Sequence, residues 1–125
     1  MNKTLLMTAV ALLMGAGMAS AAALSEVDTA GGKVMAATDT GMTVYTFRKD
    51  AENVSNCYDD CAVKWPPFLA AEGAEPEGAL TVIERKDDTY QWALNGKPLY
   101  FWAGDTAKGD ATGDGVGGVW DVVRP

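Results

Sequence analysis

The feature of this sequence that most constrains its fold is an internal repeat. Residues 40–50 and 95–105 align without a gap at an offset of 55 residues. The matching pairs are Gly41 with Gly96, Tyr45 with Tyr100, Phe47 with Trp102, Asp50 with Asp105 and, further along, Trp65 with Trp120. A period of about 50 residues is typical of a duplicated supersecondary unit, and two copies are too few for a solenoid. The repeat therefore predicts one pseudo-symmetric domain with copies at about residues 31–70 and 86–125.

Both copies carry the pattern of a β-hairpin. Residues 89–94 alternate in side-chain character with a period of two, as a half-buried strand does. Asn95-Gly96 is a favoured two-residue hairpin turn, because both residues tolerate a positive φ. Pro98 lacks an amide donor, so the returning strand is expected at a sheet edge. The expected strands cover residues 33–38, 42–47, 80–85, 89–94, 97–102 and 119–123.

One short helix is expected between the hairpins. Asn56 can cap its N-terminus, the helix would cover residues 57–64, and Pro66-Pro67 would end it. Residues 70–78 are typical of an acidic linker, and residues 104–118 form a long glycine-rich loop. The chain is therefore predicted to be mainly β: a small antiparallel sandwich or a partly closed barrel, built from two pseudo-symmetric hairpin repeats with one short helix.

Residues 1–21 have the pattern of a cleaved signal peptide. Lys3 supplies the positive charge, residues 5–14 are apolar, and Ala19-Ser20-Ala21 is a small-residue cleavage pattern. The apolar run is shorter than the roughly 20 residues that a membrane span needs. We therefore expect a single mature domain of residues 22–125 that is periplasmic or secreted and has no stable membrane anchor.

The composition narrows the possible functions. The chain has no histidine, two cysteines, 10 basic and 17 acidic residues, and a net charge of −7. Ser-His-Asp catalysis, Cys-His catalysis and histidine-ligated metal sites all require histidine. Nucleic-acid binding requires clustered lysine and arginine residues, to which an acidic chain is poorly suited. We expect neither an enzyme nor a nucleic-acid-binding protein, and no cofactor.

Two motifs that combine aromatic residues with aspartate are the main candidates for a site. Along a strand, Tyr45 and Phe47 share a face, as do Tyr100 and Trp102, and an aspartate follows three residues later in each copy. In one interpretation the rings form the core and the aspartates cap turns. In the other, two aromatic–carboxylate sites bind a small cation or a polar ligand. The candidate residues are Tyr45, Phe47, Asp50, Trp65, Tyr100, Trp102, Asp105 and Trp120.

These motifs resemble those of a known bacterial family. Residues 45–50 and 100–105 match the Y-x-[FWY]-x-x-D signature of a family described as predicted lipoproteins or secreted repeats of unknown function. Residues 55–67, with the pattern S-x-C-x-x-x-C-A-x-x-W-P-P, and residues 115–120, G-x-G-G-x-W, are similar to its middle and closing motifs. The resemblance implies an envelope location and a duplicated β domain, and it implies no established activity. Because no cysteine follows the signal at a position that could carry a lipid, we expect a non-lipidated member.

The two cysteines are expected to pair. Cys57 and Cys61 lie four residues apart near the expected start of the helix. An oxidising compartment favours a disulfide, and an undistorted helical turn does not place two sulfur atoms ideally at this spacing, so we expect an irregular turn. A redox-active dithiol is the alternative. Against it, the spacing is not C-x-x-C, and no histidine or basic cluster is present to activate a thiol.

Residues 110–121 partly match a calcium-binding loop. Asp110, Thr112, Asp114 and Asp121 occupy positions 1, 3, 5 and 12 of the EF-hand template, and Gly115 occupies position 6. The flanking segments, however, are a glycine-rich loop and a strand, and aspartate is shorter than the usual glutamate at the last position. The alternative is an acidic loop without a metal, whose glycines allow tight turns.

The sequence as a whole favours a non-catalytic binding or interaction protein. Its partner would be an unidentified envelope protein or a small ligand. Nothing in the sequence selects a pair of carboxylates held at the separation that a glycosidase needs. The alternative is a metal-binding or redox-linked accessory protein of the envelope that uses the acidic loop or the cysteine pair.

Overall fold

The structure, a computed structural model, describes residues 22–125, and strands are its main elements. In chain order the elements are β1 (Leu24–Thr29), β2 (Gly32–Ala37), β3 (Tyr45–Phe47), α2 (Asp60–Lys64), β4 (Leu69–Ala70), β5 (Leu80–Glu84), β6 (Tyr90–Leu94), β7 (Lys97–Pro98), the 3-10 helix η2 (Val116–Gly118) and β8 (Trp120–Val122). The expected signal peptide, residues 1–21, lies outside the described residues. None of the described helices is long and apolar enough to cross a membrane.

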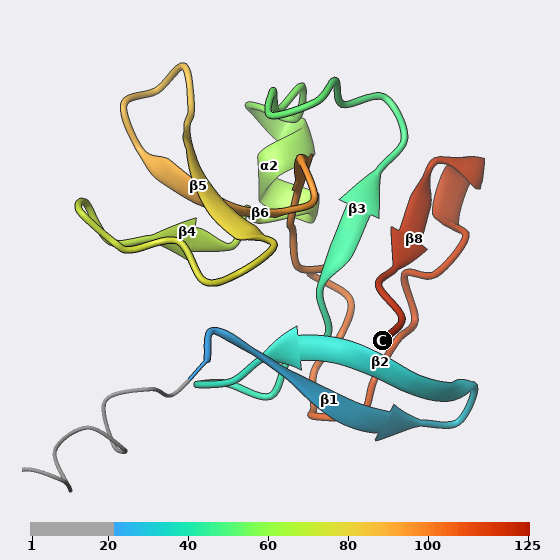
Figure 1. The fold of residues 1–125 in the computed structure, drawn as a ribbon. Helices are drawn as coiled ribbons and strands as arrows, with labels where there is room; N and C mark the ends of the chain where they lie inside the picture. The colour runs from blue at the N-terminus through green and yellow to red at the C-terminus, as the bar shows by residue number, and fades with distance from the viewer. Residues whose placement is uncertain (1–21) are drawn as a thin grey trace, which may run out of the picture.

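The strands form small antiparallel sheets (Figure 1). β1 pairs with β2, β3 pairs with β8, and the largest sheet has the order β4-β6-β5, with β7 also paired to β6. In Figure 1 the β1–β2 hairpin lies below, the β4–β5–β6 sheet at the upper left and the β3–β8 pair at the right. The predicted fold class is confirmed: the protein is mainly β and consistent with a small sandwich, and no sheet of the described residues closes into a barrel.

The second copy follows its sequence pattern closely. β5 and β6 are antiparallel partners, and β6 turns into β7 through Asn95 and Gly96, whose φ angles of 52° and 82° are both positive. Pro98 pairs with Ala93, and β6 is the only strand that β7 pairs with among those described. β7 ends at Pro98, shorter than the expected 97–102. The Leu99 N–H still donates to the Trp92 carbonyl of β6, but Tyr100 bonds Tyr45 of β3 instead, so the chain leaves β6 there.

The first copy differs from its prediction. The expected hairpin of residues 33–38 and 42–47 is reduced to an isolated bridge between Ala36 and Thr43, followed by the three-residue β3. β2 instead pairs along its whole length with β1, a strand that the sequence analysis did not assign. β1–β2 therefore corresponds to β5–β6, and each copy is a hairpin followed by a segment that carries the aromatic motif.

The sequence analysis did not assign β1 because of the amino-acid composition of this strand. Its sequence, LSEVDT, contains Glu26 and Asp28, and acidic residues are depleted in strands. Leu24 and Val27 are nevertheless buried, while Glu26 and Asp28 face solvent. Burial of these two side chains against the rest of the domain outweighs the weak local propensity.

The helix is shorter than expected, and its predicted cap is wrong. α2 begins at Asp60 rather than at residue 57, and Asp59, with a φ of 55°, precedes it. The Asn56 side chain does not cap the helix but donates to the carbonyl of Lys49, and its backbone N–H donates to Asp50. These bonds hold residue 56 outside the helical path. The sequence analysis also assigned no strand at β4, which lies where it expected a linker to begin.

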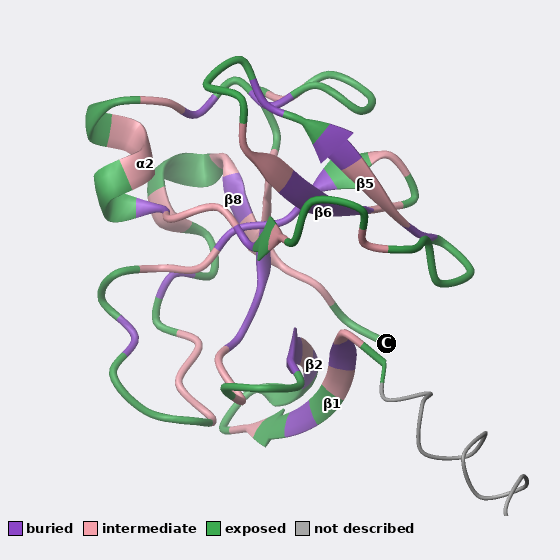
Figure 2. Ribbon diagram, turned by 90° about the vertical axis from the view of Figure 1, so that its left-hand side faces the viewer, coloured by how far each residue is buried: buried purple, intermediate pink, exposed green. Residues whose placement is uncertain are grey.

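The buried side chains form two clusters. Figure 2 marks the buried residues in purple, and among the strands they include parts of β1, β2, β5 and β6. The first contains Leu24, Ala37, Val44, Phe68, Leu80, Trp92 and Leu99. The second contains Tyr45, Cys57, Trp65, Tyr100 and Trp120. Both clusters draw on both copies, and the second also contains the tyrosines and tryptophans of the repeated motif.

Candidate functional site

Each tyrosine of the repeated motif forms a hydrogen bond with the aspartate of the other copy. The Tyr45 hydroxyl donates to Asp105 Oδ2 at 2.6 Å, and the Tyr100 hydroxyl donates to Asp50 Oδ2 at 2.7 Å. The two tyrosines also exchange backbone hydrogen bonds of 2.8 and 2.9 Å, each donating its N–H to the carbonyl of the other. The pseudo-twofold relation therefore passes between Tyr45 and Tyr100, and each tyrosine of one copy depends on the aspartate of the other.

Both aspartates also cap turns, as one of the two interpretations predicts. Asp50 Oδ1 accepts the backbone N–H of Asn56 at 2.7 Å. Asp105 Oδ1 accepts the backbone N–H of Thr112 at 2.9 Å and its hydroxyl at 2.7 Å. Asp105 is 8 % exposed, so its carboxylate belongs to the interior. The main structural role of the motif is therefore to join the two copies.

The four large rings of the motif form one continuous stack. Its order is Phe47, Trp120, Trp65 and Trp102, with centroid separations of 4.1, 3.8 and 4.3 Å. Neighbours in the stack come alternately from the two copies. Tyr45 meets Trp65 edge-on at 5.2 Å, and Tyr100 meets Trp120 edge-on at the same distance. Aromatic pairs of this kind contribute about 0.5–1.5 kcal/mol beyond their buried area, so the stack stabilises the contact between the copies.

The enclosed site shifts the ionisation of its phenols and of one carboxyl. Burial raises the pKa of Tyr45 well above its ordinary value, and the hydrogen bond to Asp105 raises it further. Burial also raises the pKa of Tyr100. The pKa of Asp50 is raised by burial too, against hydrogen bonds from the Asn56 N–H and the Tyr100 hydroxyl that lower it. Both phenols therefore stay protonated at neutral pH.

We expect the folded protein to lose stability as the pH rises above about 10, the ordinary pKa of tyrosine. In that range the unfolded chain releases phenol protons that Tyr45 and Tyr100 retain when folded, so linkage lowers the free energy of unfolding with increasing pH. Denaturant titrations at a series of alkaline pH values measure this slope. The Tyr45→Phe/Tyr100→Phe double variant should show a shallower slope, and an unchanged slope would contradict the assignment.

A buried arginine, which the sequence analysis missed, anchors the loop after Asp50. Arg85 is 3 % exposed; its Nη1 donates to Ser55 Oγ at 3.0 Å and to Gln91 Oε1 at 2.8 Å, and its Nη2 donates to the Cys57 carbonyl at 2.9 Å. Its Nε has no hydrogen-bond partner. Ser55 in turn bonds the Tyr100 hydroxyl at 2.6 Å. In the sequence, nothing distinguishes an arginine at the end of a strand that becomes buried from one that stays exposed to solvent.

The predicted disulfide is present. Cys57 and Cys61 are bonded, with their Cα atoms 5.2 Å apart. Cys57 precedes α2 and Cys61 lies within it, in agreement with the expected irregular turn. Cys57 is fully buried in the aromatic cluster, so the disulfide fixes the loop that delivers Ser55 to Tyr100.

The four residues of the calcium-like pattern do not converge. Asp110 accepts backbone N–H bonds from Thr106 and Ala107, Thr112 is bonded to Asp105, Asp114 accepts the N–H of Val122, and Asp121 pairs with Arg48. No group of three or more cysteine, aspartate or glutamate residues within 22–125 is placed to hold a metal ion. Each of the four side chains instead closes a local turn or an ion pair.

The glycine-rich loop covers one end of the ring stack. A Cβ atom at Gly113 would lie 2.7 Å from Trp65 and 2.9 Å from Trp102, so only glycine permits this approach. The N–H of Gly113 donates to the Tyr45 hydroxyl at 3.1 Å. The loop thus completes the surroundings of Tyr45 and leaves Trp102 half-buried at the surface.

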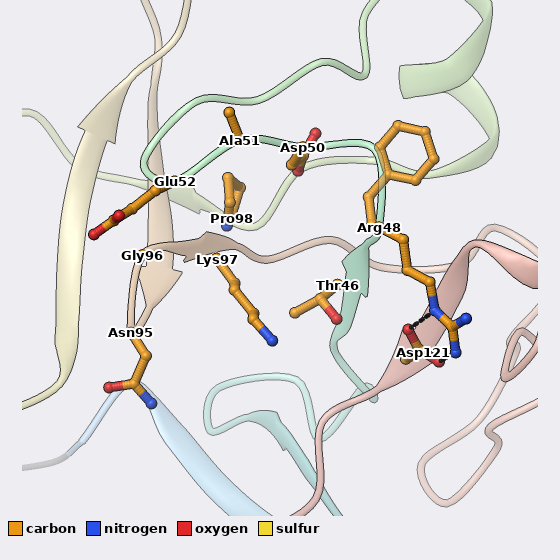
Figure 3. A pocket seen from close by; sticks show the side chains of 11 residues that line it. Thr46, Arg48, Asp50, Ala51, Glu52, Asn95, Gly96, Lys97, Pro98 and Asp121 are labelled. Atoms are coloured by element: carbon orange, nitrogen blue, oxygen red, sulfur yellow. Dashed lines mark hydrogen bonds and ion pairs between the residues drawn. The ribbon is translucent and has the colours of Figure 1, made fainter.

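A polar groove of about 550 Å³ opens beside the other end of the stack (Figure 3). It is lined by Thr46, Phe47, Arg48, Asp50, Ala51, Glu52, Asn95, Gly96, Lys97, Pro98 and Asp121. Arg48 binds Asp121 through two hydrogen bonds of 2.8 Å, whereas Lys97 forms no ion pair with any described residue. Figure 3 shows Lys97 extending between Asn95 and Thr46. Of the predicted candidates, the groove includes Phe47, Asp50 and Asp121.

Comparison with known proteins gives one family. Residues 25–68 and residues 81–124 each match the family described as a secreted repeat of unknown function. A search of the curated proteins found no match, and neither did a search of the solved structures. The two matched segments cover more than half of the chain, and each spans a hairpin and the aromatic motif that follows it. The chain therefore belongs to this family of secreted repeats.

Proposed function

We propose that this protein is a non-catalytic binding protein of the bacterial periplasm that holds a small polar ligand in the groove beside β3. The observation that carries the proposal is the convergence of charged side chains of both signs on one groove: Arg48 from the end of β3, Lys97 from β7 and Asp121 from β8. A volume of about 550 Å³ is in the range of small-molecule sites, which is about 300–1,000 Å³.

The lining favours a polar ligand over an apolar one. Phe47, Ala51 and Pro98 are its apolar residues, and the others offer charges, a hydroxyl or an amide. Arg48 is held in place by Asp121, which fixes a guanidinium at the edge of the groove before any ligand arrives. Lys97 is left free to bind an acceptor oxygen, and Glu52 can accept from a donor at the opposite end.

Two further observations support an extracytoplasmic role. The family is described as secreted, and the Cys57–Cys61 disulfide is typical of oxidising compartments such as the periplasm.

Native mass spectrometry of the protein purified from the periplasm tests the proposal. We expect an added mass on the wild type that is lost in Lys97→Gln, because a charge-assisted hydrogen bond of about 1.5–3 kcal/mol corresponds to about tenfold weaker binding or more. Lys64→Gln is the matched control, since Lys64 is exposed and does not line the groove. A bare wild-type chain, or an added mass retained equally by both variants, would rule the groove out.

A further inference from the structure

We propose that the ligand of the groove is a small organic zwitterion, such as an amino acid or a short peptide. Its carboxylate lies between Lys97 and Arg124, and its ammonium lies at Glu52. The inference rests on the proposed function and names the chemical class of ligand for the same site. The observation that carries it is a separation of charge along the groove, with cationic side chains toward one end and an unpaired carboxylate at the other.

The groove continues past Lys97 into a second hollow of about 450 Å³. The two hollows form one continuous groove, because both are lined by Thr46, Arg48, Asn95, Lys97 and Asp121. The second hollow adds Leu94, Val122, Val123 and Arg124. Of these two hollows, Glu52 lines only the first and Arg124 only the second, so the two side chains stand at opposite ends of the groove.

The end of the groove at Arg124 is cationic. The charged residues that line the second hollow are Arg48, Lys97 and Arg124, with Asp121 as their counter-charge. The sequence has 10 basic residues, of which Lys3 lies in the expected signal peptide, so a third of the others gather at this hollow. Such a concentration of cations in a chain of net charge −7 favours an anionic group of a ligand at this end.

Arg124 is held in place and still has donors to offer. Its Nη1 donates to the carbonyls of Gly31 and Lys33 at 3.3 and 3.4 Å, and its Nη2 lies 3.6 Å from Asp114 Oδ2. A separation of 3.6 Å is too long for a hydrogen bond, so the pair with Asp114 is loose. The side chain is 50 % exposed, and a guanidinium has five N–H donors, so Arg124 can bind a carboxylate without giving up these contacts.

Lys97 is the second cation for the ligand carboxylate. It is exposed and forms no ion pair with any residue of the described range 22–125. The hydrogen bond from Arg48 lowers the pKa of Asp121, and the charge of Lys97 lowers that pKa further, so the ammonium stands near the Arg48–Asp121 pair. A carboxylate between Lys97 and Arg124 accepts charge-assisted hydrogen bonds from both.

The opposite end of the groove offers a carboxylate. Glu52 is exposed and takes part in no ion pair within the described part of the chain. Its loop is tied to the hairpin turn, because the Asn53 N–H donates to the Gly96 carbonyl at 2.7 Å. Figure 3 shows Glu52 on the side of the groove away from Arg48 and Asp121. Glu52 is therefore placed to bind an ammonium group far from the cationic end.

The balance of charge favours a zwitterion over a ligand of one sign. The other two carboxylates of the groove already have partners: Asp121 binds Arg48, and Asp50 accepts the Tyr100 hydroxyl and a backbone N–H. A dianion would place a negative group at Glu52, and a dication would place a positive group among the cations. Like charges brought together weaken binding. A molecule with one charge of each sign, separated by a short chain, matches both ends.

Matched probes of equal chain length test the class of ligand. 5-Aminovalerate is a zwitterion, glutarate a dianion and cadaverine a dication, and each has five carbon atoms in a row. In NMR titrations of the protein after unfolding, dialysis and refolding, we expect 5-aminovalerate to shift the amide signals of Gly96, Lys97 and Asp121. Its affinity should exceed that of glutarate and of cadaverine by about tenfold or more. Glutarate or cadaverine binding as tightly as 5-aminovalerate, or no shift of these amides with 5-aminovalerate, would overturn the zwitterion.

Two variants assign the ends of the ligand. Glu52→Gln is expected to weaken 5-aminovalerate binding about tenfold without weakening glutarate binding, whereas Arg124→Gln should weaken both. Glu72→Gln is the matched control for Glu52→Gln, because Glu72 is exposed and lines neither hollow. Equal affinity for 5-aminovalerate in the wild type, Glu52→Gln and Glu72→Gln would overturn the proposal.

The ligand carried by the protein from the periplasm separates this inference from the proposed function. The released molecule is weighed before and after acylation of its amines and esterification of its carboxyls, and we expect at least one group of each kind. A released ligand that depends on Lys97 but lacks an amine or a carboxyl overturns the zwitterion and leaves the groove in place. A bare wild-type chain overturns both.

Discussion

Replacing Trp120 by alanine is expected to lower the free energy of unfolding by about 3–5 kcal/mol. Trp120 is 4 % exposed and lies between Phe47 and Trp65 in the ring stack, with Tyr100 edge-on against it. Its loss leaves a cavity at the point where the two copies meet and removes three aromatic contacts at once. Urea denaturation followed by far-ultraviolet circular dichroism measures the change.

Two variants serve as references for Trp120→Ala. Trp120→Phe keeps one ring in the stack and should lose clearly less stability than alanine. Val63→Ala alters an exposed apolar side chain, which is 73 % accessible, and should change the free energy of unfolding by no more than about 0.5 kcal/mol. A loss in Trp120→Ala as small as that of Val63→Ala would show that the stack contributes little to the joining of the copies.

The parts of the fold that local sequence patterns encode were predictable. The Asn95-Gly96 turn, the β5–β6 pairing and the disulfide each depend on residues close together in the chain. The repeat was also visible, because duplication leaves identical residues at a constant offset. Turn residues and the period of the sequence pattern predict contacts between residues that are close in the chain, and these three features consist of such contacts.

The pairing between the copies was not predictable from the same signals. A period of two places Tyr45 and Phe47 on one face but does not say which aspartate the phenol reaches. The turn-capping interpretation names no hydrogen-bond partner for either tyrosine hydroxyl. In the structure the Tyr45 hydroxyl bonds Asp105, which lies 60 residues away in the sequence. The buried contacts of Arg85 and the groove at Lys97 were not predicted for the same reason. Both bring together residues from segments that are distant in the chain.

The exchange of partners gives the motif a physical reason to occur twice. A single copy would hold a tyrosine without its carboxylate and a carboxylate without its phenol, and both would have to be buried unpaired or exposed. Burying polar groups without partners is costly, so a lone copy cannot enclose its own motif. Two copies satisfy each other and also complete the ring stack. Duplication and the motif are therefore one structural solution rather than two separate features.

The second large effect is expected at Asp105. Asp105→Ala removes the acceptor of the Tyr45 hydroxyl and of both the N–H and the hydroxyl of Thr112. Hydrogen bonds to a charged group contribute about 1.5–3 kcal/mol each, and they are not additive, so we expect a loss of about 3 kcal/mol in the free energy of unfolding. Asp110→Ala is the control in the same loop. Its carboxylate accepts hydrogen bonds only from Thr106 and Ala107, which are exposed, so a much smaller loss is expected.

A double-mutant cycle of Tyr45→Phe and Asp105→Asn isolates the bond between the copies from the turn-capping role. The Asp105→Asn side chain retains an oxygen that can accept the Thr112 N–H, so the coupling with Tyr45→Phe reports mainly the phenol–carboxylate bond. We expect a coupling free energy of about 1–3 kcal/mol from denaturation of the four proteins. Tyr45→Phe combined with Asp110→Asn should show none, because those two side chains share no hydrogen bond. Coupling of equal size in both cycles would mean that Tyr45 acts through general packing and that the exchange of partners does not hold the copies together.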